Sequence, residues 1–124
     1  MAIHSINHVQ LPFPAGEEGA MRAFYAGLLG LPEVRYPAED ALHFAAGPQR
    51  IALVPTARWQ PAPVASHLAF EVDNLPELRG RLLQAELPLV ENRALPGYLR
   101  FYVKDPAGTQ LEFREPDTEA GAFA

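Results

Sequence analysis

The chain has 124 residues, which suits one domain or two very small modules that share a core. Its apolar fraction of 48% is ordinary for a folded protein, and no apolar stretch approaches the roughly 20 residues of a membrane span. A net charge of −5 argues against nucleic acid as a partner, because phosphate neutralisation needs clustered lysine and arginine. The absence of cysteine excludes disulfides and thiolate metal sites. The first residues do not resemble a signal peptide, so we expect a cytoplasmic protein.

The first half of the chain predicts a strand, a helix and three short strands. Polar and apolar residues alternate over residues 5–11, which is typical of a half-buried strand. A helix follows from Glu17, with apolar residues at helical spacing, and Gly30 with Pro32 ends it. Three extended segments come next: Glu33–Tyr36, Leu42–Ala45 and Arg50–Pro55.

The same order of elements returns after a proline-rich stretch at residues 56–64. Residues 66–72 alternate again, and a helix follows with Asn74 as its N-cap and Glu77 at the capping-box position. Three more strands are expected at Leu89–Glu91, Tyr98–Lys104 and Thr109–Glu115. The second half therefore predicts the same β-α-β-β-β order as the first.

A repeated unit indicates two copies that bury a face together. Because a unit of roughly 55 residues is small for independent stability, we expect one α+β structural domain in which two βαβββ modules curl into an open, cupped β-barrel with the helices outside. The predicted organisation is a first module at 1–55, a linker at 56–64, a second module at 65–116 and a flexible tail at 117–124.

Two histidines and one glutamate occupy matching positions on three of the expected strands. His8 and His67 lie in the first strand of their halves, and Glu112 lies in the last strand of the second half. Two neutral imidazoles and one carboxylate suit a divalent transition metal that is held on one face and open to substrate on the other. If the strands converge, the pattern predicts a metalloenzyme. The alternative is a pair of histidines satisfied within the core.

The last expected hairpin separates an apolar face from a polar one. The apolar face suits packing against a helix and consists of Leu99, Phe101, Val103, Leu111 and Phe113. The polar face consists of Arg100, Tyr102, Lys104, Gln110, Glu112 and Arg114. A solvated strand face would also be polar, but histidine, tyrosine and arginine at equivalent strand positions favour a functional face.

Four segments of the chain carry a resemblance to a known family. They are Ile6-Asn-His-Val-Gln, Ala23-Phe-Tyr-Ala-Gly-Leu-Leu-Gly-Leu-Pro, Ser66-His-Leu-Ala-Phe-Glu-Val and Phe101-Tyr-Val-Lys-Asp-Pro-Ala-Gly-Thr-Gln-Leu-Glu-Phe. With them the chain resembles the glyoxalase/bleomycin-resistance/dioxygenase family, the vicinal oxygen chelate superfamily, over residues 3–116. The resemblance implies paired βαβββ modules, a homodimer, a small-molecule substrate and a divalent metal in the cup.

In that family a metal ligand comes from the first and the last strand of each module. The matching positions are His8, His67 and Glu112, and the fourth position falls on Ala52, whose methyl group binds no metal. The chain is therefore similar to the three-ligand members, the extradiol dioxygenases and fosfomycin-modifying enzymes, rather than to four-ligand glyoxalase I. His43 is left open as a replacement ligand. The metal is Fe, Mn, Ni, Co or Zn, and residue type does not choose among them.

The resemblance to the fosfomycin-modifying enzymes is the weaker of the two. Glu91-Asn-Arg93 is similar to part of that subfamily's Lys-Glu-Asn-Arg-Ser segment, and Tyr102 matches its substrate tyrosine. The lysine and serine positions fall on Val90 and Ala94, which removes donors to a phosphonate.

The resemblance implies a metal-dependent enzyme that acts on vicinal oxygens by isomerase, lyase or extradiol dioxygenase chemistry. We expect Tyr102 to donate to a developing oxyanion and Arg100 to hold a carboxylate, with a rim salt bridge as the alternative for Arg100. The runner-up is a metal-free binding protein of the bleomycin-resistance type. The His-His-Glu set favours the enzyme, because burying these groups without a metal is costly.

Overall fold

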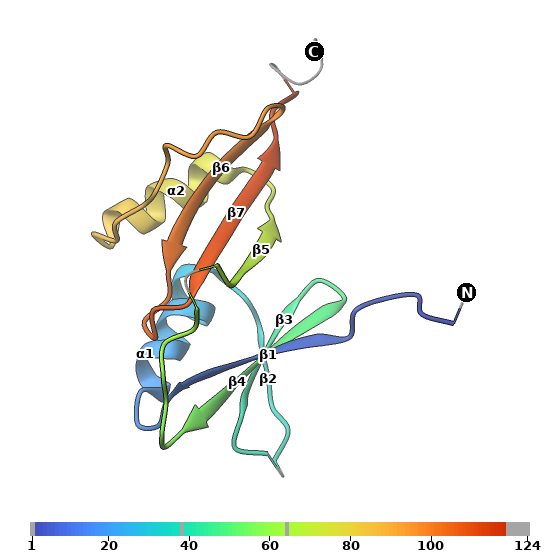
Figure 1. The fold of residues 1–124 in the computed structure, drawn as a ribbon, viewed down its shortest axis with the longest axis vertical. Coiled ribbons are helices and arrows are strands. Elements are labelled where there is room, and N and C mark those ends of the chain that lie inside the picture. The colour runs from blue at the N-terminus through green and yellow to red at the C-terminus, as the bar shows by residue number, and fades with distance from the viewer. Residues whose placement is uncertain (1, 38, 64, 119–124) are drawn as a thin grey trace. The chain divides into compact units, whose positions relative to one another are not determined.

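The structure is a computed structural model that describes residues 2–37, 39–63 and 65–118. It forms two compact units that divide between Gln60 and Pro61. The first unit contains a four-stranded sheet and a helical segment at residues 18–28, and the second contains a three-stranded sheet and the helix α2 at Leu75–Gln84 (Figure 1). The α+β fold expected from the sequence is confirmed. Residues 119–124 of the predicted tail and Val64 of the predicted linker lie outside the described residues.

The first unit places its strands in the order β1-β4-β3-β2. Its elements are β1 at His8–Pro14, α1 at Glu18–Arg22, a π-helical turn at Ala23–Leu28, β2 at Glu33–Val34, β3 at Leu42–Ala46 and β4 at Gln49–Thr56. Strand β1 runs parallel to β4, and the other neighbours are antiparallel. The first strand therefore continues through Pro12 to Pro14, beyond the predicted end at residue 11. Because β1 lies at the edge of the sheet, a proline without an N–H is tolerated there.

The core of the first unit lies between the helical segment and one face of its sheet. The Tyr25 ring stacks on Phe44 of β3 at 5.7 Å between ring centroids, and contacts Phe24 edge-on at 5.2 Å. The other buried side chains of this core are those of Phe13, Met21, Leu42, Ile51 and Leu53. Because neighbours along a strand point to opposite faces, the alternate residues of β1, β3 and β4, His8, His43 and Ala52 among them, form the second face of this sheet.

The second unit places its strands in the order β5-β7-β6. Its elements are β5 at His67–Glu71, α2 at Leu75–Gln84, β6 at Tyr98–Lys104 and β7 at Gln110–Pro116. Strand β7 runs parallel to β5 and antiparallel to β6. The strand predicted at residues 89–91 is wrong, since only Val90 pairs there, in a bridge with Tyr102. Pro88 has no N–H to extend the pairing, and the side chain of Glu91 instead contacts Arg79 of α2.

The apolar face predicted for the last hairpin forms the core of the second unit. The Phe113 ring lies parallel to Phe70 at 5.2 Å and 5.5 Å from Phe101, between ring centroids. Helix α2 contributes its buried leucines Leu75, Leu78 and Leu82. Leu99, predicted on the apolar face of the hairpin, is exposed, and so is Leu83 of α2, because each lies at the margin of its element's buried stripe.

Helix α2 is capped differently from the sequence prediction. The side chain of Asn74 makes no hydrogen bond to a backbone N–H; its Nδ2 donates to Glu77 Oε2 at 2.9 Å. The carboxylate of Glu115, at the end of β7, instead accepts hydrogen bonds from the backbone N–H of Asn74 at 2.6 Å and of Leu75 at 2.9 Å. A negative charge at the positive end of the helix is favourable there.

We expect Glu115→Gln to lower the free energy of unfolding by about 1 kcal/mol, because it weakens two charge-assisted hydrogen bonds at the helix N-terminus. Chemical denaturation measures the change. Asn74→Gly is the matched control and should cost only a few tenths of a kcal/mol, since glycine accepts the positive φ of 59° at this position. A larger loss for Asn74→Gly than for Glu115→Gln would contradict capping by Glu115.

Candidate functional site

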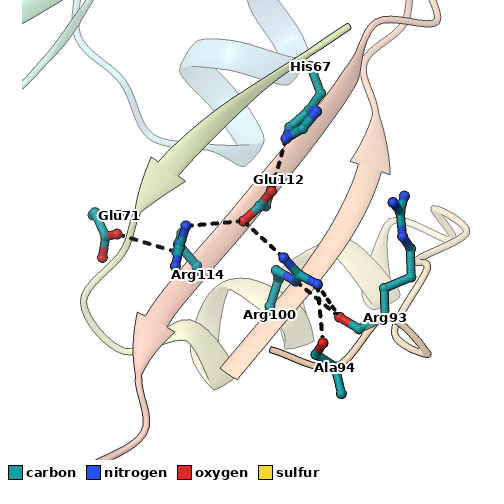
Figure 2. A network of polar contacts seen from close by, with 7 residues as sticks. All are labelled: His67, Glu71, Arg93, Ala94, Arg100, Glu112 and Arg114. Carbon is teal, nitrogen blue, oxygen red and sulfur yellow. Dashed lines mark hydrogen bonds and ion pairs between the residues drawn. The ribbon is translucent and has the colours of Figure 1, made fainter. Parts of the chain in front are cut away.

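The polar face of the second sheet gathers the side chains that the alternation pattern placed there. In the strand register, Glu112 lies opposite Ala69 of β5 on one side and opposite Tyr102 of β6 on the other. Two residues after Glu112 on β7, Arg114 lies opposite Glu71 of β5 and Arg100 of β6. Directly opposed residues share a face of the sheet. Figure 2 shows the charged members of this face, Glu71, Arg100, Glu112 and Arg114.

Glu112 is the centre of this surface and is only 3% exposed. Its Oε1 accepts a hydrogen bond of 3.0 Å from Nε2 of His67. Its Oε2 has no hydrogen bond, but a guanidinium nitrogen of Arg100 and one of Arg114 each lie 3.7 Å away (Figure 2). Because burying a carboxylate is costly without compensating charge, these contacts are what allows Glu112 to sit inside the protein.

Tyr102 lies between three charged or titratable side chains. The ring of His67 meets the Tyr102 ring edge-on at 5.7 Å between centroids. The guanidinium groups of Arg93 and Arg100 lie 4.6 Å and 5.3 Å from the Tyr102 centroid, both in cation–π range. The hydroxyl of Tyr102 makes no hydrogen bond within the residues that the structure describes. It is therefore available to a ligand on this face.

The guanidinium of Arg100 is hydrogen-bonded to the backbone of the loop before β6. Its Nε and Nη2 donate to the backbone carbonyl oxygen of Arg93 at 3.0 Å and 2.7 Å, and Nη2 lies 3.4 Å from that of Ala94 (Figure 2). The same loop is held at its start, where Nη2 of Arg79 donates to Glu91 at 3.0 Å. The hydrogen bond from Arg79 lowers the pKa of Glu91, so this contact persists above the ordinary carboxyl pKa and is lost as the pH falls through the lowered one.

The remaining predicted ligand, His8, belongs to the first unit, where it is exposed at the start of β1. Its Nδ1 donates to Oδ1 of Asn7 at 2.8 Å, and Nη2 of Arg50 donates to the same oxygen at 3.2 Å. This contact gives His8 a defined tautomer, with the proton on Nδ1 and the lone pair on Nε2.

Ala52 of β4 stands at the fourth ligand position of the family and is buried. His43 of β3 lies directly opposite Ala52, on the same face of the sheet. Nε2 of His43 donates to Oε2 of Glu39 at 2.6 Å, and Nδ1 of His43 is buried without a hydrogen bond. His43 therefore remains next to the position where the sequence left a replacement ligand open.

The structure thus brings two of the three predicted metal ligands together, His67 and Glu112, and it adds Tyr102 and Arg100 beside them. Within residues 2–37, 39–63 and 65–118, no group of three or more His, Asp or Glu side chains comes together to hold a metal. Two neighbours of the site had no role in the sequence prediction. The alternation pattern placed Arg114 on the polar face without a function, and Arg93 entered only with the fosfomycin-like segment, because it lies in a loop without any periodic signal.

The donor atoms of His67 and Glu112 fit a divalent metal. Two ligands about 2.1 Å from a metal and at right angles to each other lie about 3.0 Å apart, and Nε2 of His67 is 3.0 Å from Oε1 of Glu112. An imidazole and a carboxylate are also suitable donors for such an ion. The two arginines lie at Oε2, 3.7 Å away, so Oε1 is the oxygen that could serve a metal.

The comparisons with known proteins agree with this fold. The model of the Glyoxalase/Bleomycin resistance protein/Dioxygenase superfamily matches residues 5–113. A glyoxalase family protein from Bacillus anthracis has 32% sequence identity and a TM-score of 0.87, with 94% of this chain and 98% of that chain covered. A search of curated proteins found no match.

Two less similar structures share the fold. A lactoylglutathione lyase from Agrobacterium tumefaciens has 24% identity and a TM-score of 0.72, over 93% of this chain and 96% of that chain. An antibiotic binding protein from a Streptomyces species has 20% identity and a TM-score of 0.69, over 93% of this chain and 100% of that chain. From the match over residues 5–113 and the 32% identity to the Bacillus protein, the chain belongs to the glyoxalase/bleomycin resistance protein/dioxygenase superfamily.

Proposed function

We propose that this protein is a metal-dependent enzyme that acts on a small substrate with two adjacent oxygen atoms. His67 and Glu112 are two ligands of its divalent metal, which is Fe, Mn, Ni, Co or Zn. The observation that carries the proposal is the 3.0 Å contact between Nε2 of His67 and Oε1 of a nearly fully buried Glu112. The family resemblance assigns His8 as the third ligand, and the metal measurements below test that assignment.

When bound, the metal supplies Lewis acidity to the two substrate oxygens. The residues of this chain orient the site and handle charge and protons. Arg100 and Arg114 keep Oε2 of Glu112 in place and offset its charge. The free hydroxyl of Tyr102 donates a hydrogen bond or a proton to the oxygen on which negative charge develops. The similarity to a lactoylglutathione lyase makes lyase chemistry one candidate, beside isomerase and extradiol chemistry.

The second candidate is a metal-free protein that binds a small molecule. It is favoured by the same two arginines, because they offset the buried charge of Glu112 without any metal. The structural similarity to an antibiotic binding protein fits this alternative. Metal content separates the two functions, since only the enzyme needs the His67–Glu112 pair as ligands.

We expect the protein, purified without chelator, to carry near-stoichiometric Fe, Mn, Ni, Co or Zn by elemental analysis. His67→Ala and His8→Ala should each lose most of it, because each removes one of three ligands. His4→Ala is the matched control, since His4 is exposed in the segment before β1. It should keep the metal.

The outcomes are distinct. If the unaltered protein binds none of these metals even after reconstitution, the enzyme proposal is wrong and the metal-free binder is favoured. If His67→Ala loses the metal and His8→Ala keeps it, the metal site stands and the assignment of His8 as its third ligand is wrong.

A further inference from the structure

Three arginines form a cluster on the polar face of the second unit: Arg93, Arg100 and Arg114, called the arginine cluster below. Two carboxylates face them. Glu112 is shared by Arg100 and Arg114 at 3.7 Å, and Glu71, which is 67% exposed, lies 3.5 Å from Arg114 (Figure 2). A chain with a net charge of −5 therefore concentrates positive charge at one place, next to the proposed ligands. Such a local excess attracts anions.

Arg93 is the member of the arginine cluster that has no ion-pair partner among the described residues. Its guanidinium lies over the ring of Tyr102 at 4.6 Å and makes no hydrogen bond or ion pair within the part of the chain that the structure describes. In Figure 2 its side chain carries no dashed line, while the guanidinium of Arg100 reaches the backbone of the same residue. The ring of Tyr102 occupies one flat side of the Arg93 guanidinium, which leaves the N–H donors along its edge open.

The loop that carries Arg93 is held in place from two directions. Arg100 donates to the carbonyl oxygens of Arg93 and Ala94, and Arg79 of α2 holds Glu91 at the start of the loop. An arginine that is already positioned loses less conformational entropy when it binds a ligand. Arg100 is thus a positioning residue for the loop that carries Arg93, and the carboxylate contact expected for Arg100 from the sequence stays a prediction.

A buried acceptor on the same face also lacks a hydrogen bond. It is Oε2 of Glu112, whose contacts are the two ion pairs of 3.7 Å. Nε of Arg114 is likewise buried without a hydrogen bond, although it forms an ion pair with Oε1 of Glu71 at 3.5 Å. Buried polar atoms are rarely left without hydrogen bonds, so a ligand or water that supplies them would complete this surface.

We propose that the arginine cluster binds a carboxylate of the small-molecule ligand, with Arg93 as the residue that contacts it and sets this specificity. The planar fork of arginine matches the two oxygens of a carboxylate. A phosphonate would need further donors, and the neighbouring positions Val90 and Ala94 have none in their side chains. The inference rests on the proposed function in one respect: the carboxylate is taken to belong to the same small molecule whose two adjacent oxygen atoms bind the metal.

The test compares 3,4-dihydroxybenzoate with catechol as probes. Both carry two adjacent hydroxyl groups, and only the first carries a carboxylate. In calorimetric titrations of the protein as purified, we expect 3,4-dihydroxybenzoate to bind at least about tenfold tighter than catechol, as charge-assisted hydrogen bonds provide. Arg93→Gln should bring the two affinities to within about twofold of each other. Arg93→Lys should retain an intermediate preference, because it keeps the charge without the planar fork.

Arg81→Gln is the matched control, because Arg81 is exposed on α2 and its replacement changes the net charge equally. It should keep the preference. Equal binding of the two probes to the unaltered protein, binding of neither, or a preference that survives in Arg93→Gln would each overturn the proposal. Metal content, measured on the same samples, separates this failure from that of the proposed function: metal bound without a carboxylate preference leaves the enzyme proposal standing.

Discussion

Glu112→Gln is expected to remove metal binding and to destabilise the second unit at the same time. Glutamine keeps the shape of the side chain but loses its charge, and the affinity for the metal should fall by about 100-fold or more, since even residues that support a ligand cost up to that amount. Arg100 and Arg114 lose their shared counter-charge at 3.7 Å. Breaking a buried ion pair costs about 3–5 kcal/mol, but the arginine side chains are 16% and 27% exposed, so solvent screening lowers the expected loss to about 2 kcal/mol.

Metal titration and chemical denaturation, each with and without metal, measure the two effects separately. At a metal concentration of 100 times the dissociation constant, binding to the folded state adds about 2.7 kcal/mol to the stability of the unaltered protein. Glu112→Gln should lose this increment. Glu71→Gln is the matched control, because Glu71 contacts the same Arg114 from an exposed position, and it should change stability by no more than about 0.5 kcal/mol.

The two measurements also separate the two roles proposed for Glu112, as metal ligand and as counter-charge for the arginines. A Glu112→Gln protein that is destabilised yet retains its metal would show that Glu112 serves the arginines alone. A protein that keeps its full stability would show that the contacts of 3.7 Å contribute nothing, and the charge argument for this face would then be wrong.

Phe113→Ala is expected to have the largest effect on stability. Its ring is 2% exposed and lies between Phe70 and Phe101, at centroid distances of 5.2 Å and 5.5 Å. Truncation removes both contacts and leaves a cavity in a small core, so the free energy of unfolding should fall by about 3–5 kcal/mol. Denaturation monitored by circular dichroism gives the value.

Leu99→Ala is the control from the same hairpin. Leu99 is 39% exposed, and its loss should cost less than about 1 kcal/mol. Similar losses for the two variants would contradict the assignment of Phe113 to the centre of the second core. A loss below about 1 kcal/mol for Phe113→Ala would mean that the second unit refills the space, and the packing argument would be wrong.

The sequence predicted those elements whose structure depends on residues close together in the chain, such as strand β6 and the turn before β7. Strand β6 begins and ends where the alternation placed it, because each residue's burial depends on its own position along the pleat. The turn before β7 follows from Asp105 and Gly108: Oδ1 of Asp105 accepts hydrogen bonds from the N–H of Ala107 and of Thr109, and Gly108 adopts a positive φ of 87°.

Features that join distant segments could not be found in this way. The cap of α2 comes from Glu115 on another strand, and only the folded chain brings that carboxylate to the helix. The bridge at Val90 is a single pair; Pro88 has no N–H to extend it, and the side chain of Glu91 contacts Arg79 of α2. Arg93 has no periodic neighbours, so its place over Tyr102 depends on a loop that Arg100 holds from the sheet.

The sequence by itself determined the α+β class, the order of elements apart from the strand expected at 89–91, and the polar face that carries His67, Tyr102 and Glu112, because side-chain alternation is a property of each strand alone. Only the tertiary structure decided how that face is used. Pairing of β5, β6 and β7 brings Nε2 of His67 to 3.0 Å from Glu112 and places two arginines at the far oxygen of the same carboxylate. Electrostatic contacts of this kind depend on distance across strands, and no spacing along the chain contains that distance.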